Sequence, residues 1–330
     1  ETALAELRAQ GIEDEPLLFM PAPPNVPLRT LDEDASRLLL ADSISPLPLH
    51  KTLVLLDHIN RGKGGPYHDY QLLALANALC SHIGNLEFGP EVGVGPAKLD
   101  APVISPWLKR IDQMASDLRT VRDASWAPSA AYAGDARQVL SLLKPSSIDA
   151  VITSPPYPNE KDYTRTTRQD SEVLGFISNR SDLRDLKSHL MRSNTRNVYK
   201  DDDDDQWVAD NSEVQRIAED IERRRIELGK TSGFERMYSR VVRLYFGGMA
   251  KHLHDLRTVL RPGARLAYVV GDQASYLRVM IRTGRILADI ARQLGYEVVG
   301  IDLFRTRLAS ATGDQVLEET VLVRWPGRKV

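Results

Sequence analysis

The spacing of hydrophobic positions changes near residue 125. Before it, apolar residues recur at three- and four-residue intervals over 49–59, 70–83 and 107–121, which predicts amphipathic helices. Residues 85–106 are rich in glycine and proline and are predicted to form a loop. Residues 1–125 are therefore expected to be a mostly helical region, either an insertion in a larger fold or an accessory domain.

Beyond residue 126, short apolar runs alternate with longer amphipathic stretches. Strands are predicted over residues 130–133, 148–153, 265–270, 297–303 and 319–323. Helices are predicted over residues 136–143, 212–228, 234–260 and 276–294, with a weak point in the third at Gly247-Gly248. This alternation predicts an α/β fold: a mainly parallel sheet, helices on both faces, and the last two strands paired antiparallel at one edge.

The composition is that of a globular protein and argues against several kinds of site. The chain has 330 residues, of which 42% are hydrophobic and 27% charged. Cys80 is the only cysteine and the seven histidines lack metal-ligand spacing, so neither a disulfide nor a metal site is predicted. No apolar run reaches the roughly 20 residues of a membrane span, and no signal peptide is visible, so a cytoplasmic location without membrane contact is expected. The net charge of -2 means that any contact with phosphates must come from local clusters.

Ser154-Pro155-Pro156-Tyr157 follows a predicted buried strand at its carboxyl end, where ligands bind in open α/β sheets. The two prolines fix an extended backbone and donate no hydrogen bond, which leaves nearby carbonyl oxygens free to accept one. The Ser154 hydroxyl and the Pro155 carbonyl could hold the hydrogens of an exocyclic amino group and direct its lone pair at a methyl donor. The Tyr157 ring could stack on a base that has left the helix. The alternative interpretation is a rigid turn that merely leaves the strand.

Residues 149–157, Asp-Ala-Val-Ile-Thr-Ser-Pro-Pro-Tyr, resemble the catalytic motif of the S-adenosylmethionine-dependent DNA amino-methyltransferases. That family carries Asp, Asn or Ser, then Pro-Pro and an aromatic residue. The Ser form is commonest among cytosine-N4 enzymes, and the Asp and Asn forms dominate among adenine-N6 enzymes. The resemblance covers roughly residues 126–330 and implies the class I methyltransferase fold, a Rossmann-like sheet. It also implies S-adenosylmethionine as cofactor, DNA as partner, and the catalytic residues Ser154, Pro155, Pro156 and Tyr157.

The cofactor side of this resemblance is incomplete. Gly134-Asp135 resembles the acidic motif at a strand end that contacts the adenine part of the cofactor, and Thr153 and Ser154 would also contact the cofactor. The family's glycine-rich loop, Phe-x-Gly-x-Gly, has no convincing counterpart, because the glycine-rich residues 88–95 contain a proline and follow a weak strand. This loop and the first strands are therefore expected in a segment upstream of this sequence; a second chain, or their absence, is the alternative. On the first interpretation the helical region is inserted within the fold.

A charged insertion at residues 158–232 carries the candidate nucleic-acid contacts. Four arginines of this insertion are expected to contact phosphates or bases: Arg165, Arg168, Arg192 and Arg196. Acidic residues are mixed among them, so a solvated helical surface is an equal alternative. The five aspartates at 201–205 are expected to form a solvated loop rather than a metal site. Asp272, at the end of the next strand, is expected to cap the following helix rather than face the site.

The sequence thus predicts a site-specific DNA methyltransferase that modifies the N4 amino group of cytosine, within restriction–modification or defence. Adenine-N6 methylation is the nearest alternative, because it needs the same chemistry on another base. RNA base methylation is disfavoured, since no RNA-binding module is evident. A non-catalytic DNA-binding subunit also remains open, because the glycine-rich loop is missing. A restriction or defence-system subunit is a further candidate partner.

Overall fold

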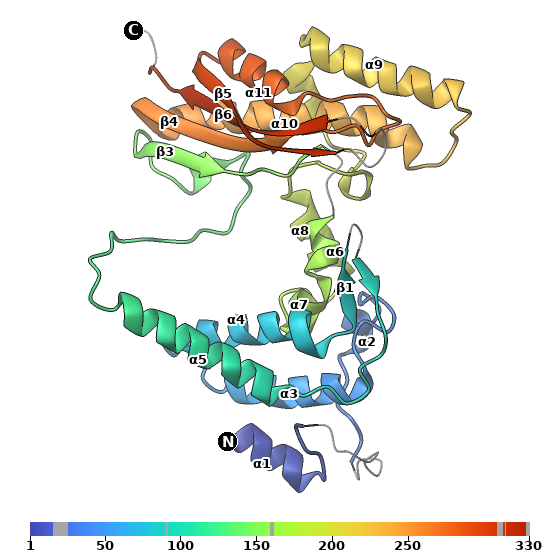
Figure 1. Ribbon diagram of the computed structural model, residues 1–330, viewed down its shortest axis with the longest axis vertical. Coiled ribbons are helices and arrows are strands. Elements are labelled where there is room, and N and C mark those ends of the chain that lie inside the picture. The colour runs from blue at the N-terminus through green and yellow to red at the C-terminus, as the bar shows by residue number, and fades with distance from the viewer. Residues whose placement is uncertain (16–25, 90–91, 159–161, 309–312, 314, 328–330) are drawn as a thin grey trace. The chain divides into compact units, whose positions relative to one another are not determined.

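The computed structural model describes residues 1–327 apart from 16–25, 90–91, 159–161, 309–312 and 314. The chain forms two compact units, each with its own hydrophobic core. The helical unit comprises Glu1–Ser129 and Tyr163–Asp185, and the sheet unit comprises Ala130–Asp162 and Leu186–Val330. The chain therefore leaves the sheet unit shortly after Tyr157, enters the helical unit and returns (Figure 1).

The helical unit is built from the amphipathic segments of the N-terminal region. Its helices are α1 (Thr2–Ala9), α2 (Glu33–Ser36), α3 (Pro46–Asn60), α4 (His68–Ala78) with a π-helical extension (Leu79–Ile83), α5 (Ile104–Val121), α6 (Tyr163–Thr166) and α7 (Arg168–Val173). Leu7, Val54, Leu75 and Ile83 are fully buried in its core. The predicted helices are confirmed. The segment predicted as loop contains an antiparallel pair as well, β1 (Leu86–Phe88) and β2 (Val92–Val94).

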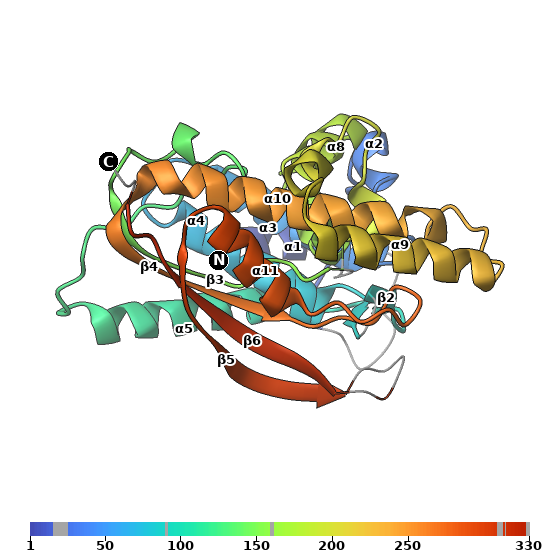
Figure 2. The ribbon, with the colours of Figure 1, turned by 90° about the horizontal axis from the view of Figure 1, so that it is seen from above.

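The sheet unit is organised around four strands in the order β3-β4-β6-β5. They are β3 (Ile148–Thr153), β4 (Leu260–Gly271), β5 (Glu297–Leu308) and β6 (Gln315–Arg324). β3 and β4 are parallel, whereas β6 is antiparallel to both β4 and β5. The α/β fold and its antiparallel pair at one edge are therefore confirmed, but the prediction of a mainly parallel sheet is wrong: of the three pairings among the described strands, only β3–β4 is parallel. Because β3 and β4 are parallel neighbours, their carboxyl ends lie at the same edge of the sheet (Figures 1 and 2).

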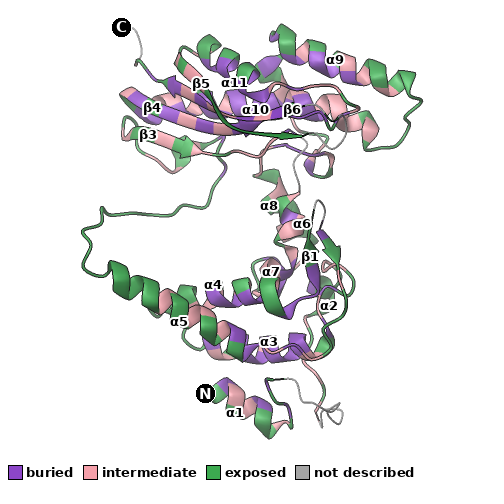
Figure 3. Ribbon diagram, in the orientation of Figure 1, coloured by how far each residue is buried: buried purple, intermediate pink, exposed green. Residues whose placement is uncertain are grey.

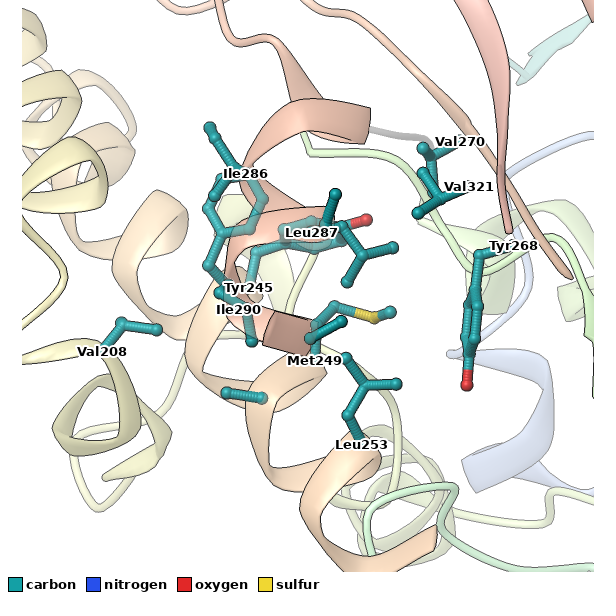
Figure 4. Packing of buried hydrophobic residues seen from close by; sticks show 14 of the residues in the cluster. Val208, Tyr245, Met249, Leu253, Tyr268, Val270, Ile286, Leu287, Ile290 and Val321 are labelled. Carbon is teal, nitrogen blue, oxygen red and sulfur yellow. The ribbon is translucent and has the colours of Figure 1, made fainter. Parts of the chain in front are cut away.

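Helices cover one face of this sheet. The described helices of the unit are α9 (Ser212–Glu227), α10 (Tyr238–Val259) and α11 (Thr283–Gln293), with four short 3-10 turns at Val139–Ser141, Thr195–Asn197, Asp204–Val208 and Glu235–Met237. The helix α8 (Arg180–Ser188) contains the point at which the chain passes from the helical unit to the sheet unit. α10 and α11 pack on alternate residues of β4 and β6, among them Tyr268, Val270 and Val321 (Figure 4). The opposite face of β3 is open in the sheet unit, where Ile152 is 84% exposed (Figure 3). The sequence predicts helices on both faces, because periodicity assigns a helix to no particular face; the described helices of this unit occupy one.

Three predicted elements differ from the structure. Residues 130–133 are exposed and lie outside the strands, so no strand leads directly into Asp135. The helix predicted over 136–143 is reduced to the 3-10 turn Val139–Ser141. The helix predicted from residue 276 begins only at Thr283, because Leu277 and Arg278 adopt positive φ angles of 55° and 65°. Its end is as predicted, at Gly295, which has a φ of 88°.

Gly247 and Gly248 do not weaken α10, which runs through them without interruption. A Cβ added at Gly247 would overlap the carbonyl oxygen of Asp204, and one at Gly248 would lie 2.5 Å from the sulfur of Met191. The two glycines therefore allow the neighbouring backbone to pack closely on the helix. Across the described part of the chain, the helices fall short of the length and apolar character that crossing a membrane requires.

Candidate active site

The catalytic-motif residues Ser154, Pro155, Pro156 and Tyr157 follow directly after β3, at the carboxyl end of that strand. Ser154 is exposed, the two prolines are partly exposed and Tyr157 is half-buried. The apolar run of β3 forms the strand, and the prolines end it because they cannot continue its hydrogen-bonded ladder. The Ser154 side chain is exposed at this edge of the sheet, where its hydroxyl also forms a hydrogen bond with the Tyr157 phenol.

The ring of Tyr157 lies against Gly271, the last residue of β4. A Cβ added at Gly271 would be 2.6 Å from Cε2 of Tyr157, closer than carbon atoms that are not bonded can approach. A glycine is therefore needed at the end of β4 for the ring to occupy this position. The sequence alone does not reveal this contact, because it depends on the parallel pairing of β3 with β4.

Tyr157 sits in a charged environment that keeps its phenol neutral. Burial raises the pKa of Tyr157, and the carboxylate of Glu318 raises it further. The Ser154 hydroxyl, Arg307 and Arg305 act in the opposite direction but do not cancel the rise. A neutral ring adds no charge repulsion toward an anionic ligand, which suits a surface for stacking.

Glu318 links the sheet edge to two arginines. It lies on β6 opposite Gly271 on one side and Arg305 on the other, and it is only 4% exposed. Nε of Arg305 donates a hydrogen bond to Glu318, and Nε of Arg307 lies 3.4 Å from its other carboxylate oxygen. Sequence reasoning missed all three charged residues. The only signal was the pair of arginines two positions apart, just beyond the predicted strand 297–303.

Asp135, the predicted contact to the adenine part of a cofactor, lies in a buried ion-pair cluster. The guanidinium of Arg137 donates hydrogen bonds to both of its oxygens, with 2.6 Å between Nη2 and Oδ2. The same guanidinium binds Asp204 at 2.5 Å, and Lys251 lies 3.0 Å from the other Asp204 oxygen. Burial alone would raise the pKa of Asp135, but the hydrogen bonds from Arg137 lower it overall. Asp135 is thus a charged structural residue rather than a free carboxylate at a strand end.

Gly134, predicted beside the cofactor, packs against a side chain of its own unit. A Cβ at Gly134 would overlap a methyl group of Leu142. The glycine-rich residues 88–95 lie in the helical unit on the β1–β2 pair, and two of them, Pro90 and Glu91, fall outside the described residues. Among the predicted cofactor contacts, Thr153 and Ser154 are therefore the two that lie at the sheet edge.

The four arginines predicted to contact nucleic acid have separate environments. Arg192 is 3% exposed and donates to both oxygens of Asp202, so it is a structural residue. Arg165 and Arg168 belong to the helical unit and donate to backbone carbonyls. Arg196 is exposed in the sheet unit, and none of the described residues forms an ion pair with its guanidinium. The insertion is therefore not one basic surface, because its arginines are largely occupied by neighbouring oxygens.

The remaining acidic residues also have structural partners. Asp272 is 1% exposed, accepts a hydrogen bond from the backbone nitrogen of Thr283 and pairs with Arg282 at 2.6 Å. It thus supports the start of α11, as predicted, although from eleven positions upstream. In the described part of the chain, no group of three His, Cys, Asp or Glu residues could hold a metal ion. The aspartate run at 201–205 is only partly solvated, because Asp204 is buried.

Comparison with known proteins gives relatives of one kind, although no family model matches the chain. The type II methyltransferase M.AvaI from Nostoc sp. (strain PCC 7120) is 28% identical over 165 residues, which are 49% of this chain and 33% of that protein. M.BsoBI from Geobacillus stearothermophilus is 25% identical over 193 residues, which are 54% of this chain and 37% of that protein. The chain therefore spans about a third of the length of these curated relatives.

Two solved structures of a Thermus thermophilus protein, assigned as a DNA modification methylase, align with 60% of the chain. One is a selenomethionine derivative, with 16% identity, a TM-score of 0.28 and 53% of that chain covered. The other is a complex with S-adenosyl-L-methionine, with 17% identity, a TM-score of 0.29 and 55% covered. Scores of this size reflect a limited overlap of the backbones. By its sequence the chain is similar, over about half of its length, to type II DNA methyltransferases, the kind of enzyme that its Ser-Pro-Pro-Tyr motif resembles.

Proposed function

We propose that the chain takes part in methyl transfer to the exocyclic amino group of a DNA base, with N4 of cytosine as the target. One observation carries this proposal: the motif Ser154–Tyr157 stands at the carboxyl end of β3, with the Tyr157 ring seated on Gly271. Similarity to two type II methyltransferases supports DNA as the substrate. The Ser form of the motif favours cytosine, since it is the commonest form among cytosine-N4 enzymes.

The proposed role of Tyr157 is to stack on a base that has been turned out of the duplex. Its ring is half-buried, neutral and held on one side by the end of β4, so one face remains for the base. Stacking of a base on an aromatic ring contributes about 1–3 kcal/mol and compensates part of the unstacking energy. Stacking on the Tyr157 ring would also fix the plane of the base at the edge of the sheet.

The proposed role of Ser154 and Pro155 is to orient the amino group. The lone pair of an exocyclic amino nitrogen is delocalised into the ring, which makes that nitrogen a weak nucleophile. Two acceptors, the Ser154 hydroxyl and the Pro155 carbonyl, would bind its hydrogens and turn the lone pair out of the ring plane. Because Ser154 is exposed, the proton lost by the nitrogen can pass to solvent. The rate gain then comes from positioning rather than from a charged base.

S-adenosylmethionine would supply an electrophilic methyl group on a sulfonium. Thr153 and Ser154 fit the methyl-donor end, because they lie at the same strand end as the amino-group acceptors. The adenine end fits less well, since both oxygens of Asp135 are already held by Arg137. The residues that grip that end therefore lie elsewhere, in a glycine-rich segment or a second polypeptide that this chain would work with.

Two other functions follow from specific observations. Adenine-N6 methylation would use the same acceptors and ring, so only the identity of the modified base separates it from the leading proposal. A DNA-binding subunit without its own activity is favoured by the closed Asp135 cluster and by the position of residues 88–95 on a β-hairpin of the helical unit. In a restriction or defence complex, a partner would then supply the cofactor.

The proposal is tested by incubating the full-length gene product with labelled S-adenosylmethionine and mixed-sequence DNA, followed by digestion to nucleosides. Label in N4-methylcytosine is expected. Label in adenine would replace the cytosine assignment, and no label with any DNA would leave the subunit function instead.

Two variants test the site itself. Ser154→Ala and Tyr157→Ala should each lower methyl transfer about 100-fold or more, because positioning and stacking are lost. Tyr132→Ala is the matched control, since Tyr132 is a 62% exposed tyrosine of the same unit outside the site. Transfer that is unchanged in Ser154→Ala and Tyr157→Ala would mean that the site has been placed wrongly.

A further inference from the structure

The carboxyl end of β5 exposes a strip of basic and apolar side chains. Phe304 and Leu308 are 63% and 71% exposed, and the side chains of Arg305 and Arg307 are 65% and 42% exposed. We call these four residues the β5 strip. β5 is the edge strand of the four-stranded sheet, so the strip lies on the rim of the sheet unit. Neither the fold nor the methyl-transfer step uses it.

The carboxylate of Glu318 holds both arginines in place through ion pairs. It is buried, whereas their guanidinium groups reach solvent. Both contacts to Glu318 are made by Nε, and none of the described residues pairs with the terminal nitrogens of either guanidinium, so these donors can serve another ligand. A guanidinium fork of this kind matches the oxygens of a phosphate. Two cations on one anion leave a net charge of +1 at this point of the surface.

The strip is connected to the candidate active site through the sheet. Glu318 is the direct neighbour of Arg305 across β5 and β6, and of Gly271 across β4 and β6. Gly271 in turn carries the ring of Tyr157. Arg305 and Arg307 are also close enough to Tyr157 to lower its pKa, against the rise caused by burial. A base stacked on Tyr157 would therefore have its own backbone near the two arginines.

We propose that Arg305 and Arg307 bind backbone phosphates of the DNA strand that carries the target base. This rests on the proposed function and identifies a nucleic-acid contact in a place that the sequence did not indicate. Charge complementarity is the main argument: the whole chain has a net charge of -2, so phosphate binding needs a local cationic group with free donors. Exposed aromatic and apolar side chains beside arginines, as at Phe304, are typical of surfaces that hold single strands.

The test measures binding rather than methylation. The affinity of the full-length protein for a short DNA duplex is determined by fluorescence anisotropy between about 50 and 200 mM salt. Arg305→Gln/Arg307→Gln should bind at least about tenfold more weakly at low salt, and its salt slope should fall by roughly 0.9 for each lost phosphate contact. Arg216→Gln/Arg223→Gln on α9 is the matched control, because these arginines are also exposed and paired with carboxylates. It should bind like the wild type.

A substitution of Glu318 should change the affinity for DNA in the opposite direction. Glu318→Gln frees both arginines from their internal partner and should tighten DNA binding, whereas a purely structural trio predicts unchanged or weaker binding. Glu213→Gln, which frees Arg216 in the same way, is the control for a general change in net charge. If the double arginine variant unfolds, Arg305→Gln/Arg307→Gln/Glu318→Gln removes all three charges, leaves no unpaired buried carboxylate, and should still show the weaker binding and the reduced salt slope.

The outcomes separate this inference from the proposed function. Loss of DNA binding in the arginine variants, in a protein that methylates no base, would support the strip and reject the enzyme. Normal binding and a normal salt slope in these variants, in a protein that does methylate DNA, would reject the strip and leave the enzyme. Binding of a protein to this edge strand, with DNA affinity unaffected by the variants, would reject the strip as well.

Discussion

Two clusters in the sheet unit contain the same residue types in opposite arrangements. In the first, Arg137 lies between Asp135 and Asp204, and all three are less than a tenth exposed. In the second, the buried Glu318 lies below two exposed arginines, Arg305 and Arg307. The first cluster is closed, because each oxygen of Asp135 and Asp204 has a cationic partner. The second is open, because its cations keep donors that no described residue uses.

The difference shows that burial decides what an ion pair can do. A buried pair is held in place because breaking it leaves an uncompensated charge in a poorly solvated site. An exposed pair contributes little to stability, and its cation can exchange one oxygen partner for another. The buried, paired carboxylate of Asp135 is therefore poorly suited to contact a ligand, whereas the exposed guanidinium of Arg305 is well suited to it.

The largest expected effect is on the closed cluster. Arg137→Met leaves two buried carboxylates that only Lys251, on Asp204, still neutralises through an ion pair among the described residues, so the unfolding free energy should fall by about 3–5 kcal/mol. Urea unfolding measures this change. Arg216→Met, which removes a pair exposed on α9, is the control and should change stability by less than about 1 kcal/mol. Equal losses in the two variants would break the distinction between closed and open clusters.

A further buried acid, Glu172, extends the comparison to the helical unit. The Glu172 side chain is fully buried, neither carboxylate oxygen has a hydrogen-bond partner among the described residues, and Arg168 is 3.5 Å away. Burial raises the pKa of Glu172 to about 7, against the lowering effect of Arg168. The folded protein then holds a proton that the unfolded chain loses above its ordinary pKa of 4.5. Stability should therefore fall as the pH rises from about 4.5 to about 7, by at most about 3 kcal/mol, and stay level above that.

Glu172→Gln should remove this decline and make the protein more stable than the wild type at pH 8. Urea unfolding at a series of pH values measures it, with Glu227→Gln on the surface of α9 as the control. A wild type whose stability instead rises between pH 5 and 7 would show that the carboxylate is compensated by a partner, as in the closed cluster.

A smaller effect is expected where the open cluster meets the tyrosine. Gly271→Ala forces the Tyr157 ring away from β4, and a displacement of about 1 Å can lower a reaction rate about 100-fold. Methyl transfer should fall by up to that factor while the affinity for DNA, measured by anisotropy, changes little. In a Tyr157→Ala background the same substitution should have almost no further effect, and additive losses would argue against the contact.

The smallest effect should come from a single arginine of the open cluster. Arg305→Gln leaves Arg307 on Glu318 and removes a side chain that is 65% exposed, so urea unfolding should show a change of less than about 1 kcal/mol. The contrast with Arg137→Met is the sharpest form of the comparison, since both variants remove one guanidinium from a buried carboxylate.

The part of the site that is continuous in sequence was predictable. The apolar run of β3 and the two prolines after it define a strand end locally, and the structure places Ser154 there. Contacts between strands were not predictable in this way. Gly271, Glu318 and Arg305 become neighbours only through the register of β4, β5 and β6. The sequence also could not show which arginines form ion pairs. Arg192 pairs with Asp202 in the folded protein, whereas no described residue forms an ion pair with Arg196.

Domain organisation shows the same limit. The polar insertion was predicted as one continuous segment, but Tyr163–Asp185 packs with the helical unit while the residues after it pack with the sheet. Periodicity can predict a helix, but not the core against which its apolar side will pack. Asp135 was misplaced for a related reason: a short apolar run before it resembled a strand, but residues 130–133 have no strand partner.

The close approach of Asp204 to Gly247 fixes which aspartates of the run 201–205 point inward and which point to solvent. Asp202 and Asp204 point inward to Arg192 and Arg137, whereas Asp201 and Asp203 are exposed. Neutralising an exposed member should therefore be tolerated, and neutralising an inward one should not. A single inserted or deleted residue between Arg192 and the glycine contact would exchange the two sets without altering the charge. In evolution the exposed positions of this segment would change readily, whereas its length and its two inward aspartates would stay fixed.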